Sequence, residues 1–157
     1  MIVNTSNSIQ LKVPISHYRG IAEEQILLDT GAIENFINQT TVDKLCLGTK
    51  RLPYSRAVYN VDRTMNQAGT ITRACNLLVT QGNKRECVRF FVTNLGHDRM
   101  LFGYPWFKKF KPDIDWEKNE LKGPKVKIET LLHGTLQHAK TWLKQKSQDN
   151  EDLILKA

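Results

Sequence analysis

The chain lacks most of the features that mark secreted, membrane-spanning or metal-dependent proteins. Its 157 residues include only three cysteines, an odd number without a CxxC pair, which argues against a disulfide framework and for a reducing compartment. No apolar run approaches the roughly 18–20 residues that a membrane helix needs. Residues 1–10 lack the basic start and apolar centre of a secretory signal. We therefore expect a cytoplasmic protein.

Histidines are also few, and their spacing does not suggest a metal site. His133 and His138 are five residues apart, which does not place them on one face of a helix. His97 stands alone, and an exposed turn residue is the preferred interpretation. We predict neither a metal ion nor another cofactor.

Positive charge is present but scattered. The net charge is +7, and the basic residues extend from Lys12 to Lys156 among acidic ones, most densely at Lys108, Lys109 and Lys111. A solvated surface is the preferred interpretation over a dedicated nucleic-acid site, because scattered charge is weak evidence for one. With 40% hydrophobic and 25% charged residues, the chain is long enough for one domain with a core.

Short strands dominate the predicted structure. Apolar residues alternate over residues 9–15 and 88–92, a strand is expected over 21–28, and 100–103 is an apolar run closed by glycine. Thr40 and Asp43 resemble a capping box that starts a short helix. A hairpin is expected with arms at 58–61 and 69–79. Pro105 suits the first turn of a helix over 104–110, and a last short strand is expected near 114–116.

The pattern changes after Gly123 and Pro124. Six apolar residues then recur at roughly helical spacing and predict an amphipathic helix: Leu131, Leu132, Leu136, Ala139, Trp142 and Leu143. We therefore predict an all-β domain over residues 1–124 and a helical extension with a tail over 125–157. Trp142 either packs on its own domain or adds contacts between two copies, and the sequence does not favour either.

Asp29 directly follows an apolar run, in the stretch ILLDTGAIENF at residues 26–36. A carboxylate there is either a turn former or a reacting group. A lone carboxylate loses hydration at such a place, whereas two carboxylates brought together share one proton. One of the pair then acts as a base on water, and the other acts as an acid toward a carbonyl.

The residues around Asp29 favour the reacting group over the turn former. Thr30 offers a hydroxyl that can fix the loop, Gly31 has no Cβ to hinder a peptide or a partner loop, and Ala32 keeps the turn small. An apolar strand precedes the motif. A hairpin that can close over it follows, and then the segment 101–103.

Three segments, in this order and spacing, resemble a retropepsin, the aspartic protease family of retroviruses and long-terminal-repeat retrotransposons. They are DTGAIENFI, VYNVDRTMNQAGTIT and MLFGYPWFKKFKPDIDW. The similarity is most specific to gypsy-type elements, in NLGHDRMLFGYPWFKKFKPDIDW, and it covers roughly residues 9–123. The resemblance implies a closed all-β structure with one lobe per chain, and a homodimer that cleaves a retroelement polyprotein in the cytoplasm or within virus-like particles.

The resemblance also implies roles for individual residues. Asp29 would be the catalytic carboxylate, Thr30 would hydrogen-bond to the partner loop, and Gly31 would line the substrate cleft. The implied substrate-binding set is Ala32, the flap residues Asn60, Val61, Asp62, Arg63 and Thr64, and the segment Leu101, Phe102 and Gly103, which would pack behind the active-site loop.

Counting motifs supports a dimer without the resemblance. The chain has one Asp-Thr-Gly and no Asp-Ser-Gly. The other aspartates lack this context, because Asp62 and Asp98 fall in turns, while Asp113 and Asp115 alternate outward on a strand. The second carboxylate must come from another copy, and twofold symmetry is the commonest way to bring identical loops together.

Two positions depart from the family pattern. Retroviral members usually carry an acidic residue in this part of the loop that contacts the substrate backbone, whereas here the loop runs Ala32-Ile33-Glu34-Asn35, and the sequence does not decide whether Glu34 takes that part. Arg63 occupies a flap position where gypsy-type relatives often have glycine. A bulky side chain at the flap tip either narrows the cleft or slows the motion of the flap, or it marks a copy that is no longer selected for proteolysis. The alternative function is therefore a non-catalytic dimerisation or peptide-binding module captured by a host, and a nucleic-acid-binding accessory is a third.

Overall fold

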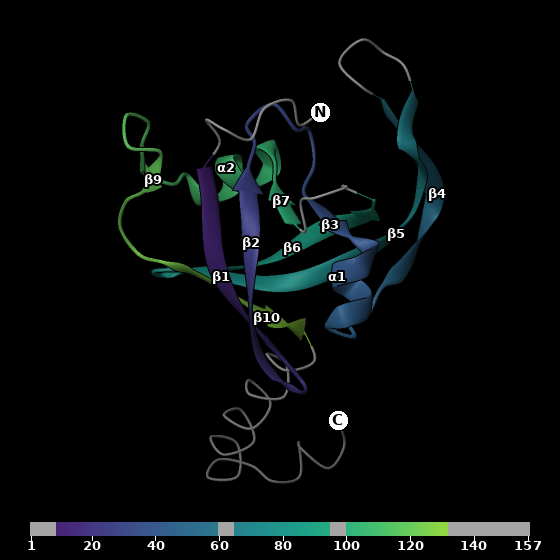
Figure 1. Cartoon of the computed structure of the whole chain (residues 1–157), viewed down its shortest axis with the longest axis horizontal. Coiled ribbons are helices and arrows are strands. Elements are labelled where there is room, and N and C mark those ends of the chain that lie inside the picture. The colour runs from purple at the N-terminus through teal and green to yellow at the C-terminus, as the bar shows by residue number, and fades with distance from the viewer. Residues whose placement is uncertain (1–8, 60–64, 95–99, 132–157) are drawn as a thin grey trace, which may run out of the picture.

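The computed structural model describes residues 9–59, 65–94 and 100–131, drawn in colour in Figure 1. These residues form ten strands and two short helices. The strands are β1 (Ile9–His17), β2 (Gly20–Leu28), β3 (Phe36–Asn38), β4 (Lys50–Tyr59), β5 (Met65–Gln81), β6 (Lys84–Thr93), β7 (Met100–Phe102), β8 (Ile114–Asp115), β9 (Glu120–Leu121) and β10 (Val126–Thr130). The helices are α1 (Gln39–Lys44) and α2 (Tyr104–Phe110). None of the described helices is long and apolar enough to cross a membrane.

Most of the strands form one sheet that closes on itself. The order is β10-β1-β2-β7-β3-β6-β5-β4, and a further antiparallel pairing joins β10 to β5. This pairing makes a ring of seven strands and leaves β4 as an outer strand on β5. The predicted all-β, closed structure is therefore confirmed, and β8 and β9 form a separate small ribbon.

The core lies inside this ring and follows the alternation of the sequence. Ile9, Val13 and Ile15 of β1 are buried between more exposed neighbours, as expected for a strand with one face toward a core. Helix α2 closes one end of the core with Trp106, which is fully buried. Its ring stacks on Phe102, with the ring centroids 4.5 Å apart. The predicted strands over 9–15 and 88–92 and the helix over 104–110 are thus confirmed.

The start of α1 differs from the prediction. Asn38, not Thr40, caps the helix, and its side chain accepts a hydrogen bond from the Thr40 backbone N–H at 3.2 Å. Asp43 instead accepts from the Gln39 side chain at 2.9 Å. An asparagine is among the best capping residues, and here it precedes the predicted one by two positions. The predicted capping box is therefore wrong, although the short helix is present.

Strand β4 is longer than the predicted hairpin arm, because it begins at Lys50 and contains Pro53. Proline cannot donate to a sheet ladder, so it occurs on edge strands and at bulges. Both conditions hold here, since β4 is the outer strand and its register with β5 shifts between Arg51 and Arg56.

Strand β10 extends the sheet past the boundary predicted at residue 124. It pairs in parallel with β1 and antiparallel with β5, and Val126 and Ile128 are buried in the core. The all-β unit therefore includes Thr130. The predicted helix and tail lie outside the described residues from position 132 onward.

The three cysteines differ sharply in their environments, which leads to a prediction. Burial raises the pKa of the Cys75 thiol from 9.0 to about 12, whereas Cys46 and Cys87 are exposed. The thiolate is the reactive form, so at pH 8 we expect Ellman's reagent to modify Cys46 and Cys87 but not Cys75 in the folded protein. Denaturant should release the third thiol. Three thiols reacting without denaturant would contradict the buried position of Cys75.

Candidate active site

Asp29 lies where β2 leaves the sheet, as the sequence predicted. Strand β2 pairs in parallel with β7, with Leu28 opposite Phe102. One residue later, the Asp29 backbone N–H donates to the Phe102 carbonyl oxygen at 3.0 Å. The strand pairing therefore continues as far as Asp29, and the position of its backbone is set by the sheet and not by a free loop.

The loop after Asp29 folds back onto that residue. The Gly31 N–H donates to Asp29 Oδ1 at 2.9 Å, and the Ala32 N–H donates to the Asp29 carbonyl oxygen at 3.2 Å. This is the turn that an aspartate side chain commonly makes with the backbone two residues later. Asp29 stays half-buried while Thr30 and Gly31 are exposed. The carboxylate is thus oriented by the loop and remains accessible.

Strand β7 forms the wall behind the loop. Leu101 and Phe102 are fully buried, and the Tyr104 N–H donates to the Ala32 carbonyl oxygen at 2.8 Å. The prediction that this segment packs behind the loop agrees with these contacts. These contacts hold the loop in place. The assignment of Leu101, Phe102 and Gly103 to the substrate-binding set stays a prediction.

Asn35 is a positioning residue that the sequence analysis missed. It is buried, and its Oδ1 accepts a hydrogen bond from the Gly103 N–H at 2.8 Å. Its own carbonyl oxygen accepts from the Phe91 N–H at 2.9 Å. Asn35 therefore ties the loop to both β7 and β6. A polar residue in a polar stretch gives little signal in one sequence, although its position just before the buried pair at 36–37 is a clue.

Glu34 joins the loop to the hairpin formed by β4 and β5. Its Oε1 lies 3.3 Å from Arg56 Nη1 on β4, and the Arg56 guanidinium lies over the Phe91 ring at 5.0 Å. In this chain, the acidic residue of the loop is engaged by the hairpin. The tip of this hairpin, with the predicted residues Asn60, Val61, Asp62, Arg63 and Thr64, lies outside the described residues.

Two large side chains next to the loop are exposed. Ile33 is 80% exposed and Tyr104 is 56% exposed, and both residues are adjacent to the loop in the sequence or through the hydrogen bond to Ala32. Apolar groups gathered next to a polar site often mark a contact surface. Ala32 itself is buried.

Other described carboxylates do not form a second site of this kind. Asp115 Oδ1 accepts from the Glu117 and Lys118 N–H groups, each at 3.1 Å, so Asp115 acts as a turn former. Asp113 is exposed. Within the described ranges, no group of three or more His, Cys, Asp and Glu is arranged to hold a metal ion.

One comparison with known proteins identifies a family. A sequence model of the PEG10/RTL1 protease domain matches residues 25–130, which contain the Asp29 loop, the hairpin and β10. No curated protein matches the chain.

Several solved structures are similar to the chain. The EIAV protease complexed with the inhibitor HBY-793 has 11% identity and a TM-score of 0.49, covering 73% of this chain and 99% of that one. The retroviral protease-like domain of Ddi1 from Leishmania major has 16% identity and a TM-score of 0.42, with coverage of 76% and 93%. A retropepsin-like aspartic protease from Rickettsia conorii has 16% identity and a TM-score of 0.36, with coverage of 80% and 95%.

Proposed function

Since the chain belongs to the PEG10/RTL1 protease domain family, we propose that it is an aspartic endopeptidase that acts as a homodimer on a retroelement-type polyprotein. The predicted retropepsin-type family is confirmed by this match. The observation that carries the proposed activity is the Asp29 loop. It presents an accessible carboxylate, fixed by Gly31 and backed by β7.

The chemistry requires the carboxylates of two copies. Two neighbouring carboxylates share one proton, because both do not ionise easily at short distance. The ionised Asp29 takes a proton from water as the water oxygen attacks the peptide carbonyl carbon. The protonated Asp29 gives its proton to the carbonyl oxygen. The tetrahedral intermediate then collapses. One of its hydroxyl groups returns a proton to the ionised carboxylate as the carbonyl re-forms, the C–N bond breaks, and the leaving nitrogen takes the proton of the other carboxyl group, so the pair again shares one proton.

The surface around the loop supports pairing of two copies. Thr30 and Gly31 are exposed at the front of the loop, and Ile33 and Tyr104 add exposed apolar area beside it. In a twofold dimer each loop contacts its own equivalent. Thr30 then lies where its hydroxyl can bond to the partner loop, and Gly31 leaves room for a peptide backbone.

An activity assay tests the proposal. Purified protein is incubated with a peptide library at mildly acid pH, with and without pepstatin, and the products are identified by mass spectrometry. Cleavage that pepstatin blocks supports the proposal. Cleavage that chelators block and pepstatin does not would contradict it.

Substitution of Ile33 tests the proposed dimer. An aspartate at this position in each copy would place two charges in the contact, so we expect Ile33→Asp to weaken the dimer at least about tenfold. Ile21→Asp is the matched control, because Ile21 is 73% exposed at the opposite end of β2. Sedimentation measures both. Equal dissociation constants for the two variants would place the interface elsewhere.

The alternative is a non-catalytic dimer that binds peptides. Arg63, in the tip segment where gypsy-type relatives often have glycine, is the feature that favours it. A protein that dimerises and binds the pepstatin transition-state mimic, yet cleaves nothing in the library, would support this alternative.

A further inference from the structure

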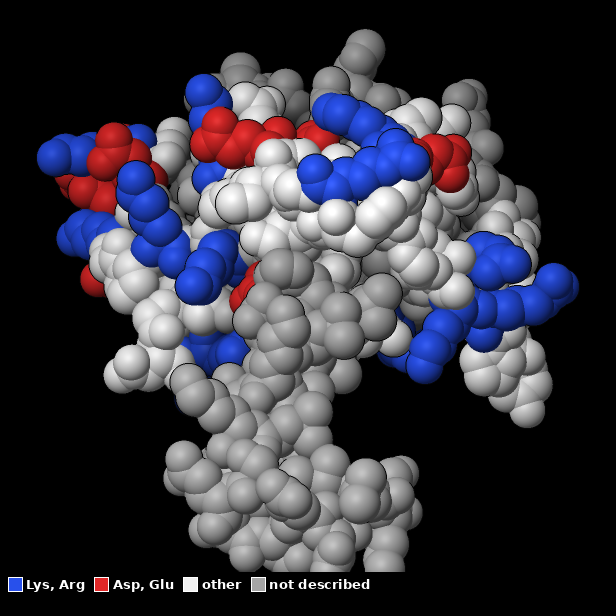
Figure 2. Space-filling view, turned by 90° about the horizontal axis from the view of Figure 1, so that it is seen from below, with Lys and Arg blue, Asp and Glu red and all other residues white. Residues whose placement is uncertain are grey.

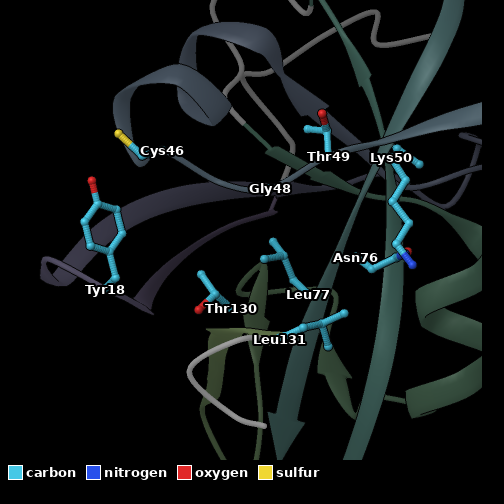
Figure 3. A pocket seen from close by; sticks show the side chains of 10 residues that line it. Tyr18, Cys46, Gly48, Thr49, Lys50, Asn76, Leu77, Thr130 and Leu131 are labelled. Carbon is cyan, nitrogen blue, oxygen red and sulfur yellow. The ribbon is translucent and has the colours of Figure 1, made fainter. Parts of the chain in front are cut away.

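A pocket opens at the end of strand β2 away from the Asp29 loop, beside Tyr18. Its volume is about 430 Å³, within the usual range for ligand-binding pockets. Ala74 and Leu77 of β5 line it but are buried in the core, so its accessible apolar surface comes from the exposed Tyr18 and from Cys46 and Leu131. In Figure 3, Tyr18 and Cys46 lie on one side, Lys50 lies on the other, and Leu77 and Leu131 lie between them.

None of the proposed catalytic residues Asp29, Thr30 and Gly31 lines the pocket, although Ala74 on its wall shares a core cluster with Ala32 of the loop. Strand β2 starts at Gly20, two residues after Tyr18, and runs for nine residues to Leu28. A strand of that length spans about 30 Å. A ligand in this pocket would therefore not contact Asp29, and the pocket needs an explanation of its own.

The side of the pocket formed by β4 and β5 is positively charged. Lys50 lines the pocket, and Arg51 lies opposite Arg73 in the strand register. Arg73 Nη1 donates to Oγ1 of Thr49, another lining residue, at 3.2 Å. All three cations are exposed, and Figure 2, which views this end of the molecule, shows Lys and Arg side chains on either side of its surface. The pocket thus suits a peptide segment in which aliphatic residues lie next to acidic residues.

The chain contains one segment of that description close by. Leu131 lines the pocket, and residues 132–157 continue from it outside the described structure. Asp149, Glu151 and Asp152 come shortly before the aliphatic run at 153–155. The other apolar stretch beyond Leu131, at 136–146, carries three lysines instead, and the cations of β4 and β5 would repel it.

We propose that residues 149–155 of the same chain bind this pocket. Leu153, Ile154 and Leu155 contact the side chains of Tyr18 and Leu131, and the acidic side chains approach Lys50 and Arg73. The connection to this segment, residues 132–148, starts at Leu131 on the pocket wall. Such a tether raises the local concentration of the segment above that of a free peptide. Weak contacts are then enough for substantial occupancy.

Two native cysteines allow a direct test in the full-length chain. Cys46 lines the pocket, and Cys87 on β6 does not, although both are exposed. The labelling rate of each thiol with a maleimide is followed by peptide mass spectrometry. A segment that occupies the pocket four-fifths of the time slows Cys46 about fivefold. We therefore expect the double variant Leu153→Asp and Leu155→Asp to label at Cys46 about fivefold faster, with Cys87 unchanged.

The controls separate the possible occupants of the pocket. Leu143→Asp lies in the lysine-rich stretch and should not change the Cys46 rate. Protection of Cys46 by a segment of the same chain does not depend on protein concentration. If the protection disappears on dilution, another copy covers the pocket and the proposal is wrong. Equal Cys46 rates in the wild type and the double variant would overturn the proposal. Cys75 must stay unreacted throughout, which verifies the fold.

A cross-linking experiment provides an independent second measurement. With Leu155→Cys, mild oxidation should form a disulfide with Cys46 within one chain. With Leu143→Cys, it should not. If both variants or neither variant cross-links to Cys46, the proposed choice of segment is wrong.

Discussion

Replacing Asp29 with Asn is expected to lower kcat/KM for peptide cleavage by at least about 10³-fold. The amide cannot take a proton from water at the pH of the reaction, and it cannot hold the proton that the two carboxylates share. The loop should survive, because the amide Oδ1 can still accept the Gly31 hydrogen bond that Asp29 Oδ1 accepts at 2.9 Å. Loss of activity would therefore report on chemistry and not on folding.

Asp43→Asn is the matched control for this variant. Asp43 is an exposed carboxylate on α1 whose Oδ1 accepts a hydrogen bond from Gln39, and an amide oxygen can replace it. Full activity is expected there. The circular dichroism spectrum and the dimer constant of both variants should match the wild type. Cleavage that survives Asp29→Asn would remove Asp29 from the catalytic role.

Gly103→Ala is expected to destabilise the fold by about 3 kcal/mol or more, which belongs to the severe class of single substitutions. A Cβ on Gly103 would overlap the backbone carbonyl oxygen of Glu34 and would lie 2.7 Å from that of Ala32. Both obstacles are backbone atoms of the Asp29 loop. The loop itself would have to move, so the hydrogen bond from Gly103 to Asn35 would be strained as well.

The matched control for this variant is Gly48→Ala. Nothing lies within 4 Å of a Cβ built on Gly48, and its backbone φ is not in the left-handed region. Urea unfolding should give a midpoint close to that of the wild type for Gly48→Ala and a much lower one for Gly103→Ala. Similar midpoints for the two variants would show that the loop does not need close contact with β7.

The sequence predicts the parts of this fold that depend on local alternation. Strand β1 and helix α2 follow directly from periodicity and from Pro105, and the Asp29 loop follows from an apolar strand that ends in a small-residue turn. Strand β10 also alternates, with Val126 and Ile128 buried. Its partners β1 and β5 are distant in the sequence, so nothing local shows that residues 126–130 close the ring.

The missed features of the site are those that depend on contacts between distant segments. Asn35 matters because Gly103 lies next to it, and the two are 68 positions apart. Glu34 is engaged by Arg56 from the hairpin, which no pattern within the loop indicates. Leu101 and Phe102 are fully buried behind the loop, and only the closed sheet shows this support.

Mixing wild-type chains with Asp29→Asn chains tests the central claim most directly, namely that one active site uses Asp29 from two copies. The two are unfolded and refolded together at a fixed total concentration, and activity is measured against the wild-type fraction. If both carboxylates are required, only pairs of wild-type chains are active. Equal amounts then give about a quarter of the full activity, which is the result we predict. About half of the full activity, falling in proportion to the wild-type fraction, would mean that each copy is complete by itself and would contradict the account.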